Sequence, residues 1–205
     1  INDLSYKIIS SHSEPMPADL RAHILDLCEP QNESIQLLAE TDHRLGKLYA
    51  KTTNQLLAKA HLKPADIKAI GCHGQTIRHM PPDIQNIPFS LQIGDANIVA
   101  TDTNIAVVSD FRRKDIALGG QGAPLAPGFH QFAFAKAGVN RAVINLGGIS
   151  NITILDAEGQ CLGFDTGPGN VLMDLWSQIH LGTQYDHNGS WAAQGNLIPS
   201  KFQKG

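Results

Sequence analysis

The chain has 205 residues, of which 42% are hydrophobic and 17% are charged, and its formal net charge is −3. This hydrophobic share is enough for a buried core, and the negative charge argues against a nucleic-acid-binding surface, which requires clustered Lys and Arg. The three cysteines are widely spaced, which argues against a disulfide framework and favours a reducing, cytoplasmic compartment. No apolar run approaches the roughly 20 residues that span a bilayer, and residues 1–15 lack the basic-then-apolar order of a signal peptide.

The first half of the chain alternates short apolar runs with segments of helical periodicity. Apolar residues recur at helical spacing from 34 to 60, which predicts a long amphipathic helix that ends before Pro64. Loops are expected over 80–88 and 119–130, where prolines and glycines gather. The other elements expected here are strands over 4–10, 67–72, 89–94 and 105–111, and helices over 17–28 and 95–103.

The second half is expected to begin with a β-hairpin. Two β-like runs, 141–156 and 161–167, flank the turn sequence AEGQ. A helix is expected over 170–180, where apolar residues again repeat at helical spacing, and the chain becomes polar and glycine-rich after Gly182. Strands that alternate with helices predict an α/β fold with a mixed β-sheet flanked by helices.

The segment 107–125, VVSDFRRKDIALGGQGAPL, is the most informative part of the chain. Asp110 leaves a predicted strand beside Arg112 and Arg113, and a glycine loop follows. Glycine lets backbone N–H groups approach an anionic ligand closely, and a carboxylate on a rigid strand end suits general-base catalysis. Asp110 is therefore a candidate catalytic residue, unless it caps a turn or pairs with one of the arginines. Alternation along the strand would place only one arginine on its face, where that arginine binds an anion or forms a surface pair.

Two other predicted strands end in polar side chains that are candidates for ligand binding. His73 follows the strand over 67–72 and either donates into a pocket or is buried and satisfied by backbone groups; its spacing to other potential ligands does not suit zinc. Asp95 follows the strand over 89–94 and either faces a ligand or caps the next helix. The candidates on these two strand ends are His73, Gln75, Thr76, Arg78, Gln92 and Asp95.

Two glycine-rich strand ends in the second half are candidates for phosphate binding. The turn in NLGGISN, 145–151, exposes N–H groups to phosphate oxygens, or is only a bulge. The segment DTGPGN, 165–170, opens a helix whose dipole attracts anions, or is a glycine turn capped by Asp165. Neither a GxxxxGK[ST] nor a GxGxxG motif is present. The candidates are Asn145, Gly147, Gly148, Ser150, Asn151, Asp165, Gly167, Gly169 and Asn170.

Six segments, in order from about residue 67 to residue 189, resemble the anhydro-N-acetylmuramic acid kinase family. They are GCHGQTIRH (71–79), LQIGDAN (91–97), SDFRRKDIALGGQGAPLAP (109–127), NLGGISNIT (145–153), FDTGPGN (164–170) and YDHNG (185–189). The resemblance implies a ribonuclease H-like lobe of the actin/Hsp70/sugar-kinase superfamily. It also implies a cytoplasmic kinase, dependent on ATP and Mg²⁺, that opens 1,6-anhydro-N-acetylmuramic acid with water and phosphorylates O6. The product, N-acetylmuramic acid 6-phosphate, belongs to peptidoglycan recycling.

The resemblance implies roles for the candidate residues. Asp110 would take the proton from the water that attacks the anomeric carbon, and Arg112 or Arg113 would bind the lactyl carboxylate. The turn 145–151 would be a phosphate motif of the superfamily, and Asp165 would bind Mg²⁺-bound water or a sugar hydroxyl. Asp186 and Gly189 match the family without an assigned role. The implied partners are the sugar and ATP, with no nucleic acid and no membrane, and a homodimer.

The resemblance also implies a domain organisation. Family members begin with a GTS-x-DG phosphate loop, which this chain lacks, and continue well past residue 205. The chain is thus expected to be an internal fragment, with 1–165 as the first lobe and 166–205 as the start of the crossing into a second, nucleotide-binding lobe. Activity is then expected of the parent protein rather than of the isolated chain. The alternatives are a glycoside hydrolase with a carboxylate pair such as Asp95 and Asp110, and a non-catalytic sugar-binding lobe.

Overall fold

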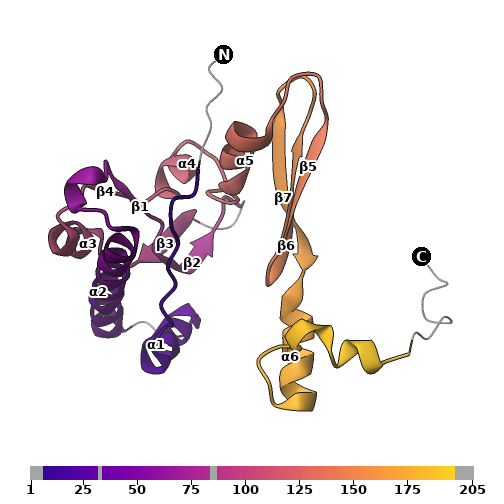
Figure 1. Ribbon diagram of the computed structural model, residues 1–205, viewed down its shortest axis with the longest axis horizontal. Coiled ribbons are helices and arrows are strands. Elements are labelled where there is room, and N and C mark those ends of the chain that lie inside the picture. Colours follow the sequence, from indigo (N-terminus) through magenta and orange to yellow (C-terminus); the bar gives the residue numbers. More distant parts are fainter. Residues whose placement is uncertain (1–6, 32–33, 84–86, 197–205) are drawn as a thin grey trace. The chain divides into compact units, whose positions relative to one another are not determined.

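The computed structural model describes residues 7–31, 34–83 and 87–196. The chain divides into two compact units, Ile1–Ala123 (unit 1) and Pro124–Gly205 (unit 2), and each has its own helices and sheets (Figure 1). The expected α/β class is confirmed, while the lobe boundary near residue 165 stays a prediction. None of the described helices combines the length and the apolar character needed to cross a membrane.

Unit 1 contains two two-stranded sheets, one parallel and one antiparallel. Strand β1 pairs in parallel with β4, and β2 pairs with β3 as an antiparallel hairpin. The strands are β1 (Ile70–Cys72), β2 (Gln75–Met80), β3 (Phe89–Ile93) and β4 (Val107–Ser109), and the helices are α1 (Ala18–Cys28), α2 (Ile35–Ala60), α3 (Ala96–Thr103) and α4 (Arg113–Ala117).

The core of unit 1 lies where α1 and α2 pack on the β2–β3 hairpin. Helix α2 begins after Ser34, whose hydroxyl oxygen accepts a hydrogen bond from the N–H of Leu37 at 3.1 Å, a common N-cap. The apolar face that the periodicity predicted for this helix faces the other core elements. The buried cluster consists of Leu20, Ile24, Leu27, Leu45, Ile77 and Ile93.

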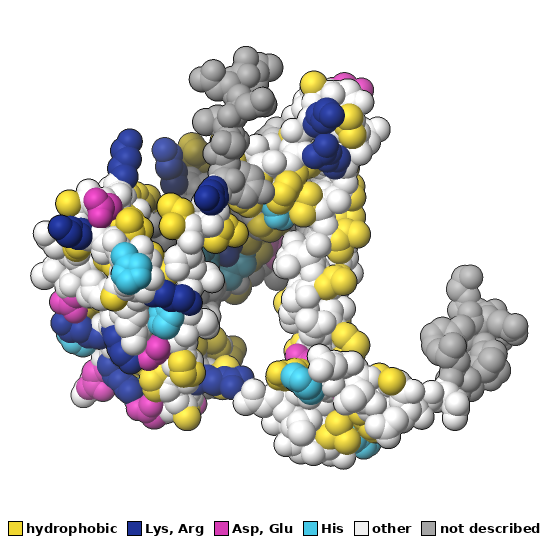
Figure 2. Space-filling model, in the orientation of Figure 1, with side chains coloured by type: hydrophobic (Ala, Val, Ile, Leu, Met, Phe, Trp, Pro, Cys, Tyr) yellow, Lys and Arg dark blue, Asp and Glu magenta, His cyan; other side chains and the backbone are white. Residues whose placement is uncertain are grey.

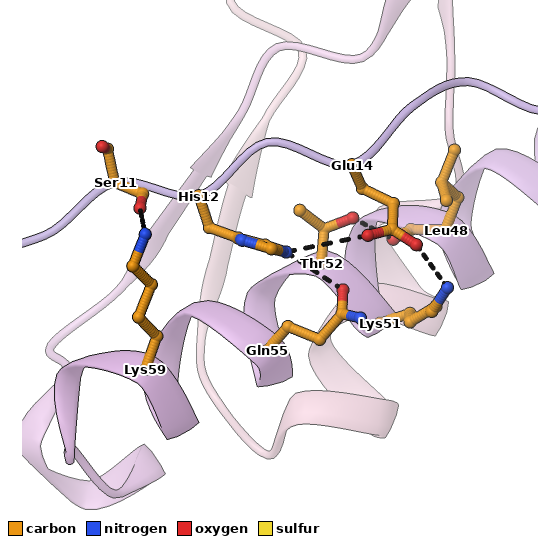
Figure 3. A network of polar contacts seen from close by, with 8 residues as sticks. All are labelled: Ser11, His12, Glu14, Leu48, Lys51, Thr52, Gln55 and Lys59. Carbon is orange, nitrogen blue, oxygen red and sulfur yellow. Dashed lines mark hydrogen bonds and ion pairs between the residues drawn. The ribbon is translucent and has the colours of Figure 1, made fainter.

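The segment before α1 lies along α2 and is held there by side chains (Figure 3). Nε2 of His12 donates to Oε1 of Gln55 at 3.3 Å and lies 3.7 Å from a carboxylate oxygen of Glu14, which also pairs with Lys51. Lys59 donates to the carbonyl of Ser11 at 2.9 Å. These contacts hold residues 11–14 against α2.

Unit 2 consists of an antiparallel meander and two helices. The strands pair in the order β5–β6–β7, and α5 packs on β6 and β7. The hairpin expected around AEGQ is confirmed, because the N–H of Gln160 donates to Oδ1 of Asp156 at 2.7 Å within that turn. The elements are α5 (Ala126–Phe134), β5 (Arg141–Leu146), β6 (Ile149–Leu155), β7 (Cys161–Pro168) and α6 (Asn170–Leu181), with 3₁₀ turns over His187–Gly189 and Ala192–Gln194.

Apolar side chains are largely exposed on unit 2. Among the described residues of this unit, Leu155 is the only hydrophobic residue that is buried. Figure 2 shows hydrophobic side chains along the three-stranded sheet. The outward apolar residues of α6 include Leu172, Trp176 and Ile179.

Four expectations about secondary structure are wrong. Residues 7–10 form no strand, and residues 4–6 of that expected strand lie outside the described part. Residues 110–112 link β4 to α4 through a turn, so the expected strand 105–111 stops at Ser109. Helix α5 replaces the end of the expected loop 119–130, because Pro127 is tolerated in a first helical turn. Parallel and antiparallel pairs occupy separate small sheets among the described residues rather than one mixed sheet.

Candidate functional site

A polar pocket lies at the strand ends of unit 1. Because β1 and β4 are parallel and Cys72 pairs with Ser109, the residues that follow them, His73 and Asp110, emerge at the same sheet edge. The cavity there has a volume of about 250 Å³. Its polar and charged lining comes from α2, β3, α3, the start of α4 and the ends of β1 and β4. These residues, which define the strand-end pocket, include Asp42, His73, Ser90, Gln92, Asp95, Asn97, Ser109, Asp110 and Arg113.

Asp110 has an unusual backbone conformation at the wall of this pocket. Its φ of 58° lies in the left-handed region, which few residues other than glycine adopt, although Asp and Asn are enriched there. Its carboxylate pairs with Arg113, because Nε and Nη2 of the guanidinium lie 2.7 and 2.6 Å from Oδ2. Such strained positions cluster at functional sites, so the left-handed conformation supports a functional role for Asp110.

The hydrogen bond from Arg113 lowers the pKa of Asp110, and the positive charge of that guanidinium adds to the effect. The Arg113→Met substitution is therefore expected to raise the pKa of Asp110. A titration of the Asp110 carboxyl carbon by NMR measures the shift. Because the Arg113 side chain is 68% exposed, the difference from the wild type should narrow in high salt. The Lys114→Met variant on the same helix is the control. An Asp110 pKa that is equal in all three proteins would contradict the attribution of the lowered pKa to Arg113.

The two arginines beside Asp110 have different partners, but strand alternation is not the reason, because it would have placed Arg112 on the face of Asp110 and β4 already ends at Ser109. Arg113 lines the pocket, whereas Arg112 is absent from its lining. Nη1 of Arg112 donates to the carbonyl of Gly122 at 2.7 Å, and Nε donates to Nε2 of His73 at 2.9 Å. Nδ1 of His73 lies 2.8 Å from the carbonyl oxygen of Gly74. Both ring nitrogens of His73 are thus engaged within the protein, which favours a satisfied histidine over a ligand contact through nitrogen.

The remaining candidates of unit 1 divide between pocket and scaffold. The Asp95 carboxylate accepts from the N–H groups of Asn97 and Ile98, so this residue caps α3 while it lines the pocket. Gln92 lines the pocket and donates to Oγ1 of Thr76 at 3.1 Å. Arg78 donates to carbonyl groups at the end of α1, outside the pocket. Gln75 and Thr76 do not line it either.

Asp42 is a pocket residue that the sequence did not reveal. Its Oδ1 accepts from the N–H of Gly94 at 2.7 Å, and its carbonyl accepts from the N–H of Asp95 at 3.2 Å. These bonds tie α2 to the turn that joins β3 to α3. Asp42 lies in the middle of a long amphipathic helix and belongs to no motif, so only the packing of α2 places it at the pocket.

Three of the phosphate candidates form a row across the sheet of unit 2. Asn145 of β5 pairs with Asn151 of β6, which pairs with Asp165 of β7. Directly opposed residues project on the same face of an antiparallel sheet, so this row collects two amides and a carboxylate. The register of the β6–β7 pairing shifts between Ser150 and Asn151, where Thr166 of β7 is the extra residue, whereas Gly147 and Gly148 form the turn between β5 and β6.

The start of α6 differs from the expectation that its N–H groups are open to an anion. The N–H of Gly169 donates to the carbonyl of Gly148 at 2.8 Å, and the N–H of Asn170 donates to the carbonyl of Gly147 at 2.7 Å. Val171 donates to the carbonyl of Gly148 at 3.3 Å. The β5–β6 turn therefore caps α6 with its own carbonyl oxygens, and that particular expectation is wrong. Whether the residues of the two turns contact phosphate in another way stays a prediction.

Asp186 has a structural role in this unit. Its two carboxylate oxygens accept from the N–H groups of Trp191 and Ala192 at 3.0 and 2.9 Å. These hydrogen bonds lower the pKa of Asp186 and close the turn that follows α6. A wide pocket of about 1200 Å³ lies between α6 and this turn, lined by aromatic and apolar groups such as Trp176 and Trp191. Of the predicted site residues, Asn170 alone borders it, so the smaller strand-end pocket is the better candidate site.

Comparison with known proteins shows the family to which the chain belongs. The family model for anhydro-N-acetylmuramic acid kinase matches residues 1–204. A protein of that name from Saccharophagus degradans is 51% identical over 191 residues, which is 93% of this chain and 52% of the relative. Those of Shewanella sp. MR-7 and Actinobacillus pleuropneumoniae serotype 7 are 52% and 48% identical, over 93% and 95% of this chain and 51% and 52% of the relatives. The chain spans about half the length of the curated relatives it matches. It belongs to the anhydro-N-acetylmuramic acid kinase family.

Proposed function

We propose that the natural protein with this chain is an ATP-dependent kinase that converts 1,6-anhydro-N-acetylmuramic acid into N-acetylmuramic acid 6-phosphate during peptidoglycan recycling. Family membership over residues 1–204 supports the reaction class. The observation that carries the proposal is Asp110, an ionised carboxylate in a left-handed conformation at a pocket of small-ligand size. A polar cavity of about 250 Å³ suits one sugar unit better than a polymer.

Asp110 is proposed as the general base. Water attacks the anomeric carbon, its proton passes to the Asp110 carboxylate, and the bond from the anomeric carbon to O6 breaks. The freed O6 then attacks the γ-phosphorus of ATP, and ADP leaves. Arg113 keeps Asp110 ionised through its contact with Oδ2. A base must hold its lone pair at about 2.6–3.2 Å from the proton donor, and a carboxylate at a rigid strand end meets this need.

Unit 2 is proposed to supply the phosphate side. The row of Asn145, Asn151 and Asp165 offers oxygen and amide groups on one face of the sheet. A lone carboxylate among such groups fits Mg²⁺, which takes few protein ligands and keeps several waters, so Asp165 would hold the ion through water. No group of three or more potential metal-binding side chains occurs in the described part of the chain. The bound ion would neutralise charge on the phosphates.

The finer structural expectations belong to the same proposal. The α/β units with small sheets are consistent with a lobe of the actin/Hsp70/sugar-kinase superfamily. A homodimer and the division near residue 165 follow from the resemblance alone. Size-exclusion chromatography with light scattering on the natural protein tests the dimer. A monomer at micromolar concentration would contradict the proposal of a homodimer.

The test of the function is ADP release by the natural protein, with and without 1,6-anhydro-N-acetylmuramic acid, beside the 205-residue chain. Sugar-dependent ADP release together with a sugar phosphate signal in ³¹P NMR is the expected result. Sugar hydrolysis without ATP would instead support the hydrolase with Asp95 and Asp110, although Asp95 is occupied as the cap of α3. Sugar binding with no turnover would support a binding lobe.

A further inference from the structure

The glycine loop after Asp110 closes on a carboxylate of its own chain. The N–H of Gly122 donates to Oδ2 of Asp115 at 2.7 Å, and the N–H of Gly120 donates to the Asp115 carbonyl at 2.8 Å. A Cβ on Gly120 would overlap the Asp115 carboxylate, and Gly119 and Gly122 have φ values of 88° and 70°. The glycines therefore meet a backbone requirement of this loop. The glycine loop was expected to offer backbone N–H groups to an external anion, but the N–H of Gly122 donates to Asp115 instead.

The same loop also restrains His73, a residue that lines the strand-end pocket, through Arg112. The carbonyl of Gly122 accepts from Nη1 of Arg112, and Nε of the same guanidinium donates to Nε2 of His73. A guanidinium can only donate, so Nε2 of His73 must accept. Nδ1 then carries the single proton and donates to the carbonyl of Gly74. This chain of contacts leaves the imidazole one tautomer and one orientation at a pocket that Asp110 also lines.

We propose that Asp115 is a positioning residue, which acts through Gly122 and Arg112 to hold the His73 ring as a fixed wall beside Asp110. The part of the proposal that concerns turnover rests on the proposed function. Asp115 itself is absent from the pocket lining, so it does not touch the substrate in this arrangement. Its effect depends on one accepted hydrogen bond, which an amide oxygen can also accept.

The experiment compares Asp115→Ala and Asp115→Asn in the natural protein, with Lys114→Ala on the exposed side of α4 as the control. ¹⁵N NMR reports the tautomer of His73, and a His73→Gln variant assigns its signals. The wild type, Asp115→Asn and Lys114→Ala are expected to show one protonated and one unprotonated ring nitrogen. In Asp115→Ala the two shifts should move toward each other, because the ring exchanges between tautomers. Its kcat/KM for the sugar should fall on the order of tenfold or more, with KM for ATP unchanged.

An Asp115→Ala protein that keeps the wild-type nitrogen shifts overturns the proposal, whatever its activity. If the wild type forms no ADP with the sugar, the proposed function fails, while the nitrogen shifts still decide the role of Asp115. Should Asp115→Ala not fold, Arg112→Lys provides the same test. A lysine keeps the positive charge but lacks the planar fork that serves Gly122 and His73 together, so the single tautomer should again be lost. Unchanged shifts in that variant would count against the proposal in the same way.

Discussion

Replacing Asp110 by Asn is expected to lower kcat for the anhydro sugar by about a hundredfold to ten-thousandfold, the usual contribution of a general base. The amide keeps the size of the side chain but cannot take the proton from water. Asn also tolerates the left-handed conformation that Asp110 adopts at a φ of 58°. The backbone should therefore be undisturbed, and the loss would report chemistry. Steady-state ADP release at saturating sugar and ATP measures it.

The matched control is Asp102→Asn. Asp102 is a carboxylate near the end of α3 that pairs with Lys47 at 2.9 Å and lies outside the strand-end pocket. This variant should retain wild-type turnover. Equal thermal unfolding of both variants and the wild type would show that the fold is intact. Wild-type turnover in Asp110→Asn would rule out Asp110 as the base.

The second large effect is expected for Gly169→Ala, which should destabilise the protein by about 1–3 kcal/mol through steric overlap. A Cβ at this position would overlap the carbonyl oxygen of Gly147 and lie 2.5 Å from Oγ of Ser150. That carbonyl accepts the N–H of Asn170 at 2.7 Å, so it cannot retreat without breaking the cap of α6. Urea unfolding of the variant beside the wild type measures the loss.

Gly148→Ala serves as the comparison for this substitution. Gly148 lies in the same β5–β6 turn, but an added Cβ would meet no heavy atom within 4 Å. Its stability should stay within about 0.5 kcal/mol of the wild type, as for most open surface positions. Equal unfolding midpoints for the two alanine variants would show that the β5–β6 turn and α6 do not pack as described.

Much of the fold follows from local patterns in the sequence. The apolar repeat over 34–60 predicted α2 within one residue of its observed start, and the AEGQ turn predicted the β6–β7 hairpin. These succeed because hydrophobic periodicity and turn chemistry act between residues a few positions apart. Short helices such as α4 escaped prediction, because five residues hold too little periodicity to recognise.

The sequence by itself determined the family, the α/β class and the position of Asp110 at the end of a strand. The tertiary structure decided which partners the candidates have. It placed Asp42 of α2 at the pocket and assigned Arg113 to Asp110 but Arg112 to His73 and Gly122. A glycine motif indicates that the backbone needs space or a positive φ. It does not indicate which residue supplies the oxygen atom that occupies this space. That choice depends on contacts between residues distant in the chain, which no local pattern records.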